Sequence, residues 1–567
     1  MKSFIHFTLA SLFIIGASKL QAQDFRWAVG FGETEKAFGY SIAVDAAGNV
    51  FTIDNFNGTV DLDPGSGTFN LTSAGNKDVY VQKLDSNGNF LWSKAIGGSG
   101  NDLGSAIAID PTGNIYITGN FNGTADFDPG SGTYNMTSAG NNDIFIQKMD
   151  NNGNFLWAKA IGGTDKAFGI SIAVDAAGNV YTTGYFAGTA DFDPGSGAFN
   201  LTSAGYRDMF VQKLDANGNF LWAKSVGGGS YAFGYSVAVD DAGNVFTTGS
   251  FVGTVDFDPG SGTHNLTSIG NNDIFVQKLD ANGNFLWAKA FGSGYENAGY
   301  SIAVDAAGNV YTVGNFEGTI DFDPGSGIHN LTSIGNNDIF VQKLDANGNF
   351  LWAKAFGGDY NESIYSIAVD AESNVYITGS FYTTVDFDPG SGTYNMTSAG
   401  QSDIFIQKMD SNGNFKWAKS YGSNNYDYGL SIAIDAANNV YTKGRFNGTV
   451  NFNQGVGVHN LTSAGDNDIF LLKLSQTIHN TGHEAETIEN NTPIRVFPNP
   501  AKEIVNIETN LQDTYSIVVL DALGKTVLHK EANQSNTTLS IANLSKGVYL
   551  IQIQNQNSIH TAKLLIE

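Results

Sequence analysis

The seven tryptophans of this chain recur at one fixed interval of 65 residues. They are Trp27, Trp92, Trp157, Trp222, Trp287, Trp352 and Trp417. Aspartates keep the same period at two further places, closing stretches such as Ser-Ile-Ala-Val-Asp and opening stretches such as Asp-Ile-Phe-Val-Gln-Lys-Leu. Repeats of fixed length pack against copies of themselves, so the chain is expected to form a repeat architecture.

Each repeat predicts four short strands. In one repeat these are Ser236–Asp240, Val245–Thr248, Asp273–Leu279 and Phe285–Lys289, with a long connection between the second and the third. The runs are rich in β-branched and aromatic residues and end at turns such as Asn-Gly, which is typical of β-hairpins. Helical periodicity is absent, so the expected fold class is all-β.

Seven units of four strands predict a seven-bladed β-propeller over residues 24–475. A solenoid is the rival architecture, but a solenoid needs atypical capping repeats. Here the repeats begin with a lone fourth strand, Phe25–Val29, and end on a third strand, Asp468–Leu474, that no tryptophan follows. Pairing these segments would complete the last 65-residue blade and remove two exposed edges. We therefore expect the N-terminal strand to close the ring.

The repeat sequence resembles a known family. Trp-Ala-Lys-Ala followed by Gly-Gly, and then Tyr-Ser-Ile-Ala-Val-Asp-Ala-Ala-Gly-Asn-Val-Tyr, is similar to the bacterial β-propeller repeat called SBBP. The turn Asp280–Asn284, before Trp287, resembles the aspartate box of sialidase propellers, which implies a structural turn beside an inter-blade tryptophan. These resemblances imply a fold and little about function, because propellers host binding proteins and enzymes alike.

The two ends of the chain differ from the repeats. Residues 1–22 carry Lys2, an apolar stretch and then small residues, which is typical of a secretory signal peptide. Residues 476–493 are polar and predict a linker. Residues 494–567 form alternating runs between Gly-Lys and Lys-Gly turns and predict further short β-strands.

Residues 494–567 resemble the C-terminal sorting domain of the type IX secretion system of Bacteroidetes, which implies a small β-sandwich. The resemblance rests on Pro498-Asn499-Pro500, Gly524-Lys525, Gly547-Val548-Tyr549 and the run Lys563-Leu564-Leu565-Ile566. It implies that this segment engages the type IX machinery, directs passage across the outer membrane and is usually removed. With the signal peptide, it implies a protein that passes the periplasm and is secreted or held on the outer cell surface. No later stretch is apolar enough to predict a transmembrane helix.

Composition excludes several classes of function. The chain has no cysteine, so disulfides, thiolate catalysis and cysteine-bound zinc are ruled out. Nearly all of the net charge of −26 falls between residues 24 and 475. A propeller this acidic repels phosphate backbones, and nucleic acid is therefore not an expected partner. Cations and cationic surfaces are the expected partners.

A motif of two aspartates before Pro-Gly lies in the long connection of six repeats. The pairs are Asp61 and Asp63, Asp126 and Asp128, Asp191 and Asp193, Asp256 and Asp258, Asp321 and Asp323, and Asp386 and Asp388. In an extended chain, residues i and i+2 share a face, which holds the carboxylates about 6–7 Å apart. Calcium is the cofactor that such oxygens would bind. The alternative is that each aspartate accepts backbone N–H bonds in a turn, and the seventh copy has Asn451 and Asn453 instead.

One position of the long connection holds a flat ring in every repeat. Its residues are Phe69, Tyr134, Phe199, His264, His329, Tyr394 and His459. A place shared by His, Phe and Tyr favours a packed ring over a proton shuttle or metal ligand. The alternative is a set of stacking platforms for a sugar ligand.

The repeats differ most in the connection that follows each tryptophan strand. In a propeller, this connection and the long connection emerge on the same face. We therefore expect that face to carry both the variable and the acidic loops. It is the candidate surface for a glycan or protein ligand. Neutral drift of exposed loops is the alternative explanation. No catalytic motif is recognisable. The sequence thus predicts a non-enzymatic binding or adhesion module; a propeller-based glycoside hydrolase or lyase, and a passive surface or matrix component, are the alternatives.

Overall fold

The computed structural model describes residues 21–32, 38–455, 457–478, 494–497, 501–509, 515–520, 526–554 and 559–566. The chain divides into a repeat unit, residues 20–478, and a second unit that contains residues 479–567. Most of the predicted signal peptide and of the predicted linker lies outside the described residues. The exceptions are residues 21–22 and 476–478, which extend two paired strands.

Within the described residues, the repeat unit contains seven four-stranded antiparallel blades, and in three of them two further short strands extend the sheet to six. From the innermost strand outward they are β2 (Phe38–Val44), β3 (Val50–Phe56), β6 (Asp78–Leu84) and β7 (Phe90–Gly98); β8 (Leu103–Ile109), β9 (Ile115–Phe121), β12 (Asp143–Met149) and β13 (Phe155–Gly163); β14 (Ala167–Val174), β15 (Val180–Phe186), β18 (Asp208–Leu214) and β19 (Phe220–Gly228); β20 (Ala232–Val239), β21 (Val245–Phe251), β24 (Asp273–Leu279) and β25 (Phe285–Phe291); β26 (Ala298–Val304), β27 (Val310–Phe316), β30 (Asp338–Leu344) and β31 (Phe350–Phe356); β32 (Ser363–Val369), β33 (Val375–Phe381), β36 (Asp403–Met409) and β37 (Phe415–Tyr421); and β38 (Tyr428–Ile434), β39 (Val440–Phe446), β42 (Asp468–Ile478) and β1 (Gln21–Phe31).

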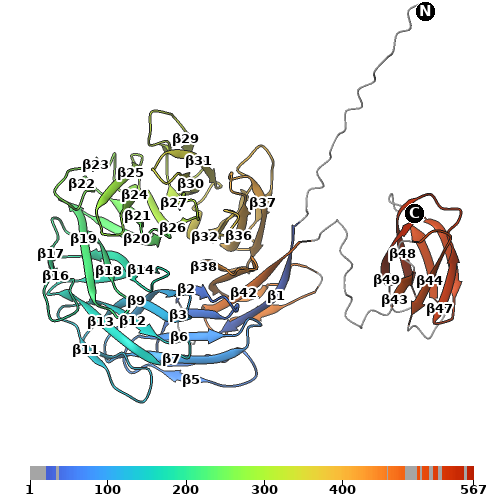
Figure 1. Ribbon diagram of the computed structural model, residues 1–567, viewed down its shortest axis with the longest axis horizontal. Helices are drawn as coiled ribbons and strands as arrows, with labels where there is room; N and C mark the ends of the chain where they lie inside the picture. The colour runs from blue at the N-terminus through green and yellow to red at the C-terminus, as the bar shows by residue number, and fades with distance from the viewer. Residues whose placement is uncertain are drawn as a thin grey trace, which may run out of the picture. The chain divides into compact units, whose positions relative to one another are not determined.

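The first strand of the chain completes the last blade. β1 pairs with β42, with Phe25 opposite Leu474 and Phe31 opposite Ile469. The innermost strands also contact one another in succession, from β2 to β8, β14, β20, β26, β32 and β38, and β38 contacts β2 (Figure 1). The pairing that the sequence predicted between the two ends of the repeat region is therefore present.

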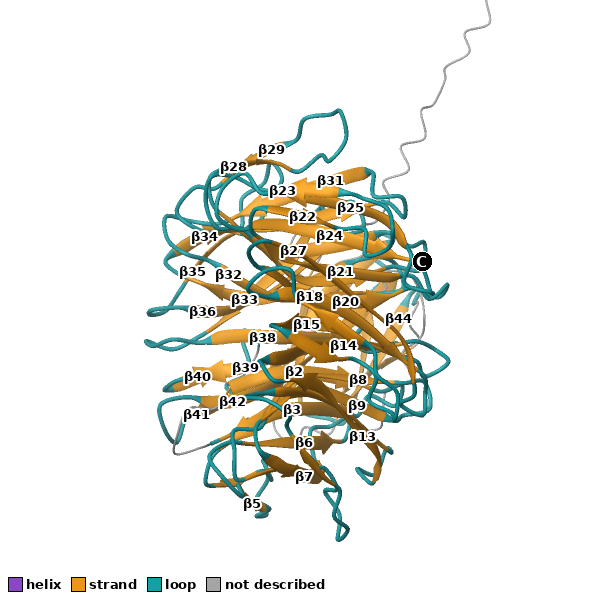
Figure 2. Ribbon diagram, turned by 90° about the vertical axis from the view of Figure 1, so that its left-hand side faces the viewer, coloured by secondary structure: helices purple, strands orange, loops and turns teal. Residues whose placement is uncertain are grey.

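The burial of the strands follows from their place in the blade. The third strands, such as β24, are buried along their whole length, and most second strands are too. Both faces of these strands pack on neighbouring blades, as the edge-on view of Figure 2 illustrates. Their continuous runs of Val, Ile and Phe fill the clefts between blades. Only the outermost strands alternate between exposed and buried residues.

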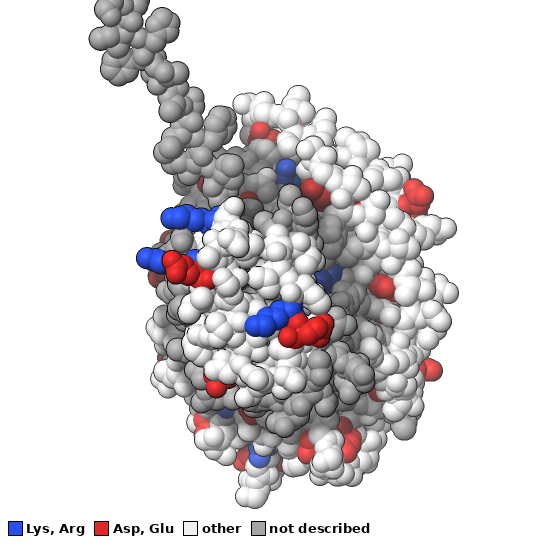
Figure 3. Space-filling view, turned by 90° about the vertical axis from the view of Figure 1, so that its right-hand side faces the viewer, with Lys and Arg blue, Asp and Glu red and all other residues white. Residues whose placement is uncertain are grey.

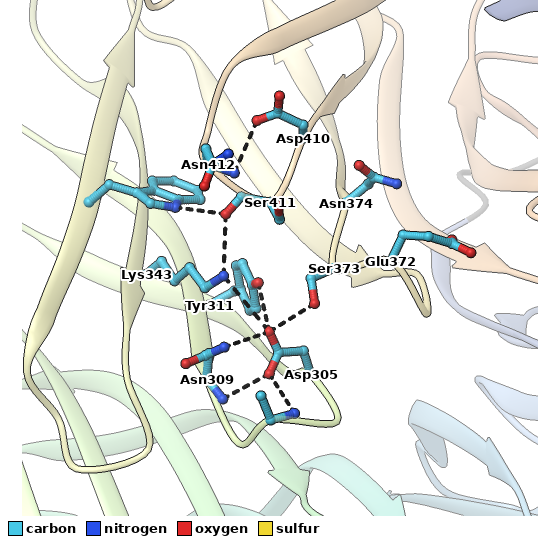
Figure 4. A network of polar contacts seen from close by, with 12 residues as sticks. Asp305, Asn309, Tyr311, Lys343, Glu372, Ser373, Asn374, Asp410, Ser411 and Asn412 are labelled. Atoms are coloured by element: carbon cyan, nitrogen blue, oxygen red, sulfur yellow. Dashed lines mark hydrogen bonds and ion pairs between the residues drawn. The ribbon is translucent and has the colours of Figure 1, made fainter. Parts of the chain in front are cut away.

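One polar joint recurs between neighbouring blades. Trp352 Nε1 and Lys343 Nζ of one blade both donate to the carbonyl of Ser411, in the turn of the next blade, at 3.1 and 3.2 Å (Figure 4). Trp27 and Lys473 of the last blade donate in the same way to Ser86 of the first blade, at 3.1 and 2.9 Å. The structural role that the sequence indicated for this turn and for the inter-blade tryptophan is confirmed.

The long connection of each repeat contains a short hairpin that the sequence did not reveal. The pairs are β4 (Thr59–Asp61) with β5 (Asn70–Thr72), β10 (Thr124–Asp126) with β11 (Asn135–Thr137), β16 (Thr189–Asp191) with β17 (Asn200–Thr202), β22 (Thr254–Asp256) with β23 (Asn265–Thr267), β28 (Thr319–Asp321) with β29 (Asn330–Thr332), β34 (Thr384–Asp386) with β35 (Asn395–Thr397), and β40 (Thr449–Asn451) with β41 (Asn460–Thr462). The labelled members of this set lie at the rim of the ring in Figure 1. Three-residue strands are too short to show a recognisable pattern.

The C-terminal unit is a two-sheet sandwich. One sheet orders β43 (Ile494–Phe497), β44 (Ile504–Thr509) and β47 (Asn536–Ser540), and the other orders β46 (Thr526–Ala532), β45 (Tyr515–Leu520), β48 (Gly547–Gln554) and β49 (Ile559–Ile566). Val505, Ile507, Ile517 and Ile551 of the two sheets share one buried core. Three of these strands, β43, β47 and β49, were not recognised individually from the sequence.

Candidate functional site

The two connections that the sequence placed on one face do meet there. Ala232 N donates to Arg207 O, and Tyr206 N donates to Ser230 O, both at 2.9 Å. Each bond joins the end of a long connection to the variable connection that follows the outermost strand of the same blade. Equivalent bonds occur in other blades, for example from Glu362 N to Asn337 O at 2.9 Å. We call this end of the ring the variable-loop face.

A cavity of about 570 Å³ opens within this face. We call it the tyrosine cavity, after five of its lining side chains. It is lined by Tyr235, Ser250, Asn272, Glu296, Asn297, Ala298, Tyr300, Asn315, Asn337, Asn361, Glu362, Ser363, Tyr365, Tyr382 and Tyr428. Burial raises the pKa of Tyr300 and that of Tyr382 to about 12, so their hydroxyls stay protonated and can both donate and accept hydrogen bonds.

The tyrosine cavity breaks the symmetry of the ring. Tyr235, Tyr300 and Tyr365 share one repeat position on the innermost strands; the first blade has Tyr40 there, and the other three have Ser105, Ile170 and Leu430. Tyr300 is 38% exposed and Tyr365 is 37% exposed. Tyrosine at this position belongs to the repeat motif itself, so the motif gave no sign that three consecutive blades combine these side chains in one cavity.

A second hollow of about 520 Å³ continues the cavity outward, since both are lined by Asn272 and Glu296. Rings follow one another along it. Consecutive centroids lie 5.4, 5.8, 5.9 and 5.7 Å apart in the series Tyr206, Tyr231, Phe233, Tyr235 and Tyr300. We call these five residues the aromatic ladder. Aromatic faces offer large apolar area, and tyrosine adds a hydroxyl at its edge.

An acidic or amide side chain secures the variable connection in four repeats. Asp102 accepts from Gly98 N at 2.7 Å and from Asn122 N at 3.3 Å. Glu362 occupies the equivalent position and accepts from Gly358 N at 2.9 Å. Burial is the main cause that raises the pKa of Glu362 to about 7, and the charge of Asp338 adds to it.

We expect the stability of the protein to depend on pH through Glu362. Between the ordinary pKa of 4.5 and about 7, the folded protein keeps a proton that the unfolded chain releases, so the free energy of unfolding falls as pH rises through this window. The E362Q variant has no such proton to release, so between pH 4 and pH 8 the wild type should lose about 3 kcal/mol of stability that the variant keeps. Unfolding midpoints across this pH range check it, and parallel wild-type and variant curves would refute it.

The aspartate pairs act on the backbone of the rim hairpins. Asp256 Oδ1 accepts from Asp258 N at 3.1 Å and from His264 N at 2.8 Å, and Asp258 Oδ1 accepts from Gly260 N at 2.8 Å. In the seventh copy the neutral amide of Asn451 accepts the same bonds at 3.1 and 2.9 Å. Among the described residues, no group of three or more His, Asp or Glu side chains is placed to hold a metal ion. These contacts favour the turn-building interpretation, and calcium binding stays a prediction.

These pairs lie at the start of the rim hairpins, beside the variable connections. Asp256 is paired with Gly227, at the end of the outermost strand β19 of the preceding blade and just before the variable connection. The same hairpin ends at His264, whose Nε2 is 3.2 Å from the carbonyl of Ala288, in the middle of β25 of its own blade. The hairpin therefore lies between the outermost strands of two neighbouring blades and pairs with backbone groups that would otherwise be exposed.

Replacing Asp256 by asparagine should leave stability within about 0.5 kcal/mol, because the amide oxygen replaces the carboxylate oxygen. Asp256→Ala should cost about 1 kcal/mol, because two backbone N–H groups lose their acceptor. Thermal melts with calcium and with chelator check both variants. A calcium-dependent rise in melting temperature that D256N abolishes would contradict this and reveal a metal site.

The seven ring positions are packing positions with partly exposed faces. Each ring lies against the phenylalanine that begins an outermost strand, for example Phe69 on Phe90 at 4.9 Å and His329 on Phe350 at 4.8 Å. The polar tips of Tyr134, Tyr394, His264, His329 and His459 lie 2.7–3.4 Å from a carbonyl of the same strand. This geometry favours the packed-ring interpretation and separates the seven rings from the tyrosine cavity.

Charge is dispersed over the described residues of the face drawn in Figure 3. In the view of Figure 3, the charged side chains of the described residues stand singly or in small groups among uncharged ones. None of the described segments is a helix that could cross a membrane.

Known families match three segments of the repeat unit and most of the C-terminal unit. The β-propeller repeat family called SBBP matches residues 91–128, 156–185 and 221–250. The family described as the secretion system C-terminal sorting domain matches residues 495–567. Such a domain marks a protein for export by type IX secretion to the cell surface or the extracellular space.

Curated relatives are distant and longer. An uncharacterized WD repeat-containing protein of Acanthamoeba polyphaga mimivirus is 25% identical over 503 residues, which are 74% of this chain and 36% of the relative. Regulatory protein FlaEY of Caulobacter vibrioides is 27% identical over 174 residues, 29% of this chain and 17% of the relative. The chain thus spans well under half of the length of either.

Two solved structures are similar only in part. PorZ, an essential bacterial surface component of the type-IX secretion system of Porphyromonas gingivalis, aligns with 95% of this chain and all of its own at 12% identity and a TM-score of 0.17. A protein of unknown function from Bacteroides thetaiotaomicron covers 78% of this chain and 99% of its own at 12% identity and a TM-score of 0.24. The family matches, which do not depend on these alignments, show that the chain contains SBBP β-propeller repeats within residues 91–250 and a secretion system C-terminal sorting domain at residues 495–567.

Proposed function

We propose that this protein is a non-enzymatic binding module, secreted or displayed on the cell surface, and that its ligand is a glycan bound in the tyrosine cavity. The observation that carries the proposal is the cavity itself, in which five tyrosines are combined with five asparagines in one sector of the ring. Ligand sites combine apolar and aromatic walls with a few fixed polar groups. Tyrosine faces suit the C–H faces of sugar rings, and amide and hydroxyl groups suit their hydroxyls.

A carbohydrate-active enzyme is the second candidate. Glu296 and Glu362 both line the cavity, and two carboxyl groups are what glycoside hydrolysis requires. Against catalysis, Glu362 is 1% exposed and accepts a hydrogen bond from the backbone of Gly358. A side chain so enclosed supports its loop better than it reaches a glycosidic bond. Reducing-end assays on the oligosaccharides that the protein binds distinguish the two candidates.

The proposal predicts that the Y300A/Y365A variant loses affinity for glycans by tenfold or more, because two exposed ring faces leave the cavity. A glycan array followed by titration calorimetry on the full chain measures this. The matched control is Y134A/Y394A, which removes two tyrosines that are 41% and 42% exposed at the rim. Loss of affinity in the control alone would move the site to the rim rings. An array without signal would favour a passive surface component.

A further inference from the structure

Arg207 lies in the second hollow with its charge facing aromatic rings. Its guanidinium is 5.0 Å from the ring centroid of Tyr185 and 5.9 Å from that of Phe233. Among the described residues, no carboxylate forms an ion pair with it. A guanidinium held against two rings is restricted in motion and keeps its N–H donors for another acceptor.

Arg207 is the one arginine at its repeat position. The neighbouring repeats have the neutral Asn142 and Asn272 there, and the first repeat has Lys77. In a chain with a net charge of −26, a cation without a carboxylate partner attracts anions locally against a repulsive background. Binding of an anion here would therefore report this site rather than general attraction.

The aromatic ladder connects this cation to the tyrosine cavity. Tyr231 and Phe233 line the second hollow beside Arg207, and Tyr235 and Tyr300 line the cavity. Since consecutive ring centroids are 5.4–5.9 Å apart, the ladder extends over more than one sugar ring. A ligand stacked along it can hold one unit in the cavity and present another to the guanidinium.

We propose that the second hollow is a subsite for an anionic substituent, a carboxylate or a sulfate ester, on a saccharide chain whose neighbouring units occupy the tyrosine cavity. This inference rests on the proposed glycan-binding function. Guanidinium groups bind carboxylate and sulfate oxygens through paired N–H donors. Ser230 and Asn271, which also line the hollow, supply further hydrogen-bonding groups.

Calorimetric titration of the full chain tests the subsite with three probes of equal length: a neutral gluco-oligosaccharide, an oligogalacturonate and a sulfated galacto-oligosaccharide. We expect at least one acidic probe to bind more tightly than the neutral one. R207Q should weaken that probe by tenfold or more and leave the neutral probe unchanged, and R207K should restore part of the affinity. The matched control is K166Q, which removes an exposed charge from a variable connection of the neighbouring blade.

The outcomes separate the two proposals. The acidic probe that is lost in R207Q identifies the substituent as carboxylate or sulfate. The subsite proposal is wrong if R207Q binds the acidic probes as the wild type does, or if neutral and acidic probes bind equally. In either case, binding that depends on Tyr300 would still support the tyrosine cavity as a glycan site. If none of the three probes binds, both proposals fail. Equal losses in R207Q and K166Q would show that only the overall charge matters and would also overturn the subsite.

Discussion

Replacing Lys443 by methionine is expected to lower the free energy of unfolding of the repeat unit by about 3–5 kcal/mol. Lys443 and Asp54 form an ion pair in which both side chains are 0% exposed, and Lys443 also donates to Ile53 O at 2.9 Å. The pair joins β39 of the last blade to β3 of the first. Burial lowers the pKa of Lys443, and Asp54 opposes that change. Removing the lysine leaves a carboxylate buried without its cation.

The repeat supplies its own control for this prediction. Most other repeats have threonine where Lys443 stands, and all other repeats have glycine where Asp54 stands, as in Thr248 and Gly249. The double variant D54G/K443T restores both residue types and should regain most of the stability that either single change removes. Chemical denaturation of the wild type, both single variants and the double variant measures the coupling. Additive losses in the double variant would show that the two side chains do not stabilise the joint as a pair.

Deleting residues 21–32 is expected to have the largest effect on the repeat unit. The deletion exposes the edge of β42. It also removes Trp27, whose ring centroid lies 6.3 Å from that of Tyr441. It also removes one of the two donors to Ser86. An open edge strand invites pairing between molecules. We expect aggregation or loss of cooperative unfolding, measured by size-exclusion chromatography and by denaturation.

A circular permutant is the matched control for the deletion. Leu279 lies opposite Phe285 across the turn Asp280–Asn284, and Leu474 lies opposite Phe25 in the same register. Linking Leu474 to Phe25 through Asp-Ala-Asn-Gly-Asn therefore builds a fourth strand in the usual chain order. The permutant should fold as the wild type does. If the truncated chain stayed monomeric with unchanged stability, β1 would not be needed to complete the ring.

The repeats could be predicted from the sequence because the same pattern occurs seven times at a fixed spacing. Strand β24 lies within the predicted bounds, and the offset between Phe25–Val29 and Asp468–Leu474 gave the pairing of the chain ends. The rim hairpins were not predicted because their three-residue strands carry no apolar pattern. In the strand Thr254–Asp256, for example, the pairing is supported by the hydroxyls of Thr254 and Thr267, which lie 2.8 Å apart. Local contacts of this kind leave no period to detect.

The candidate site was only partly accessible from the sequence. The variable connections pointed to the face that contains the tyrosine cavity, whereas the pattern of Tyr235, Tyr300 and Tyr365 is that of ordinary strand residues. They lie 65 residues apart, and only the closed arrangement of blades brings them to one cavity. The buried pair of Lys443 and Asp54 was missed for the same reason, since its members are separated by 389 residues.

The pairing of β1 with β42 also means that the last blade cannot be completed before both strands are available. Arg26 and Ser475, which join across it at 2.7 Å, are 449 residues apart in the chain. β1 can therefore pair only after β42 has been synthesised, and closing a loop of this length carries an entropic cost. Each of the first six blades can assemble from contiguous chain, whereas the seventh depends on both extremities of the repeat region. A protein built in this way is vulnerable to trapping as an incomplete ring until its final repeat is available.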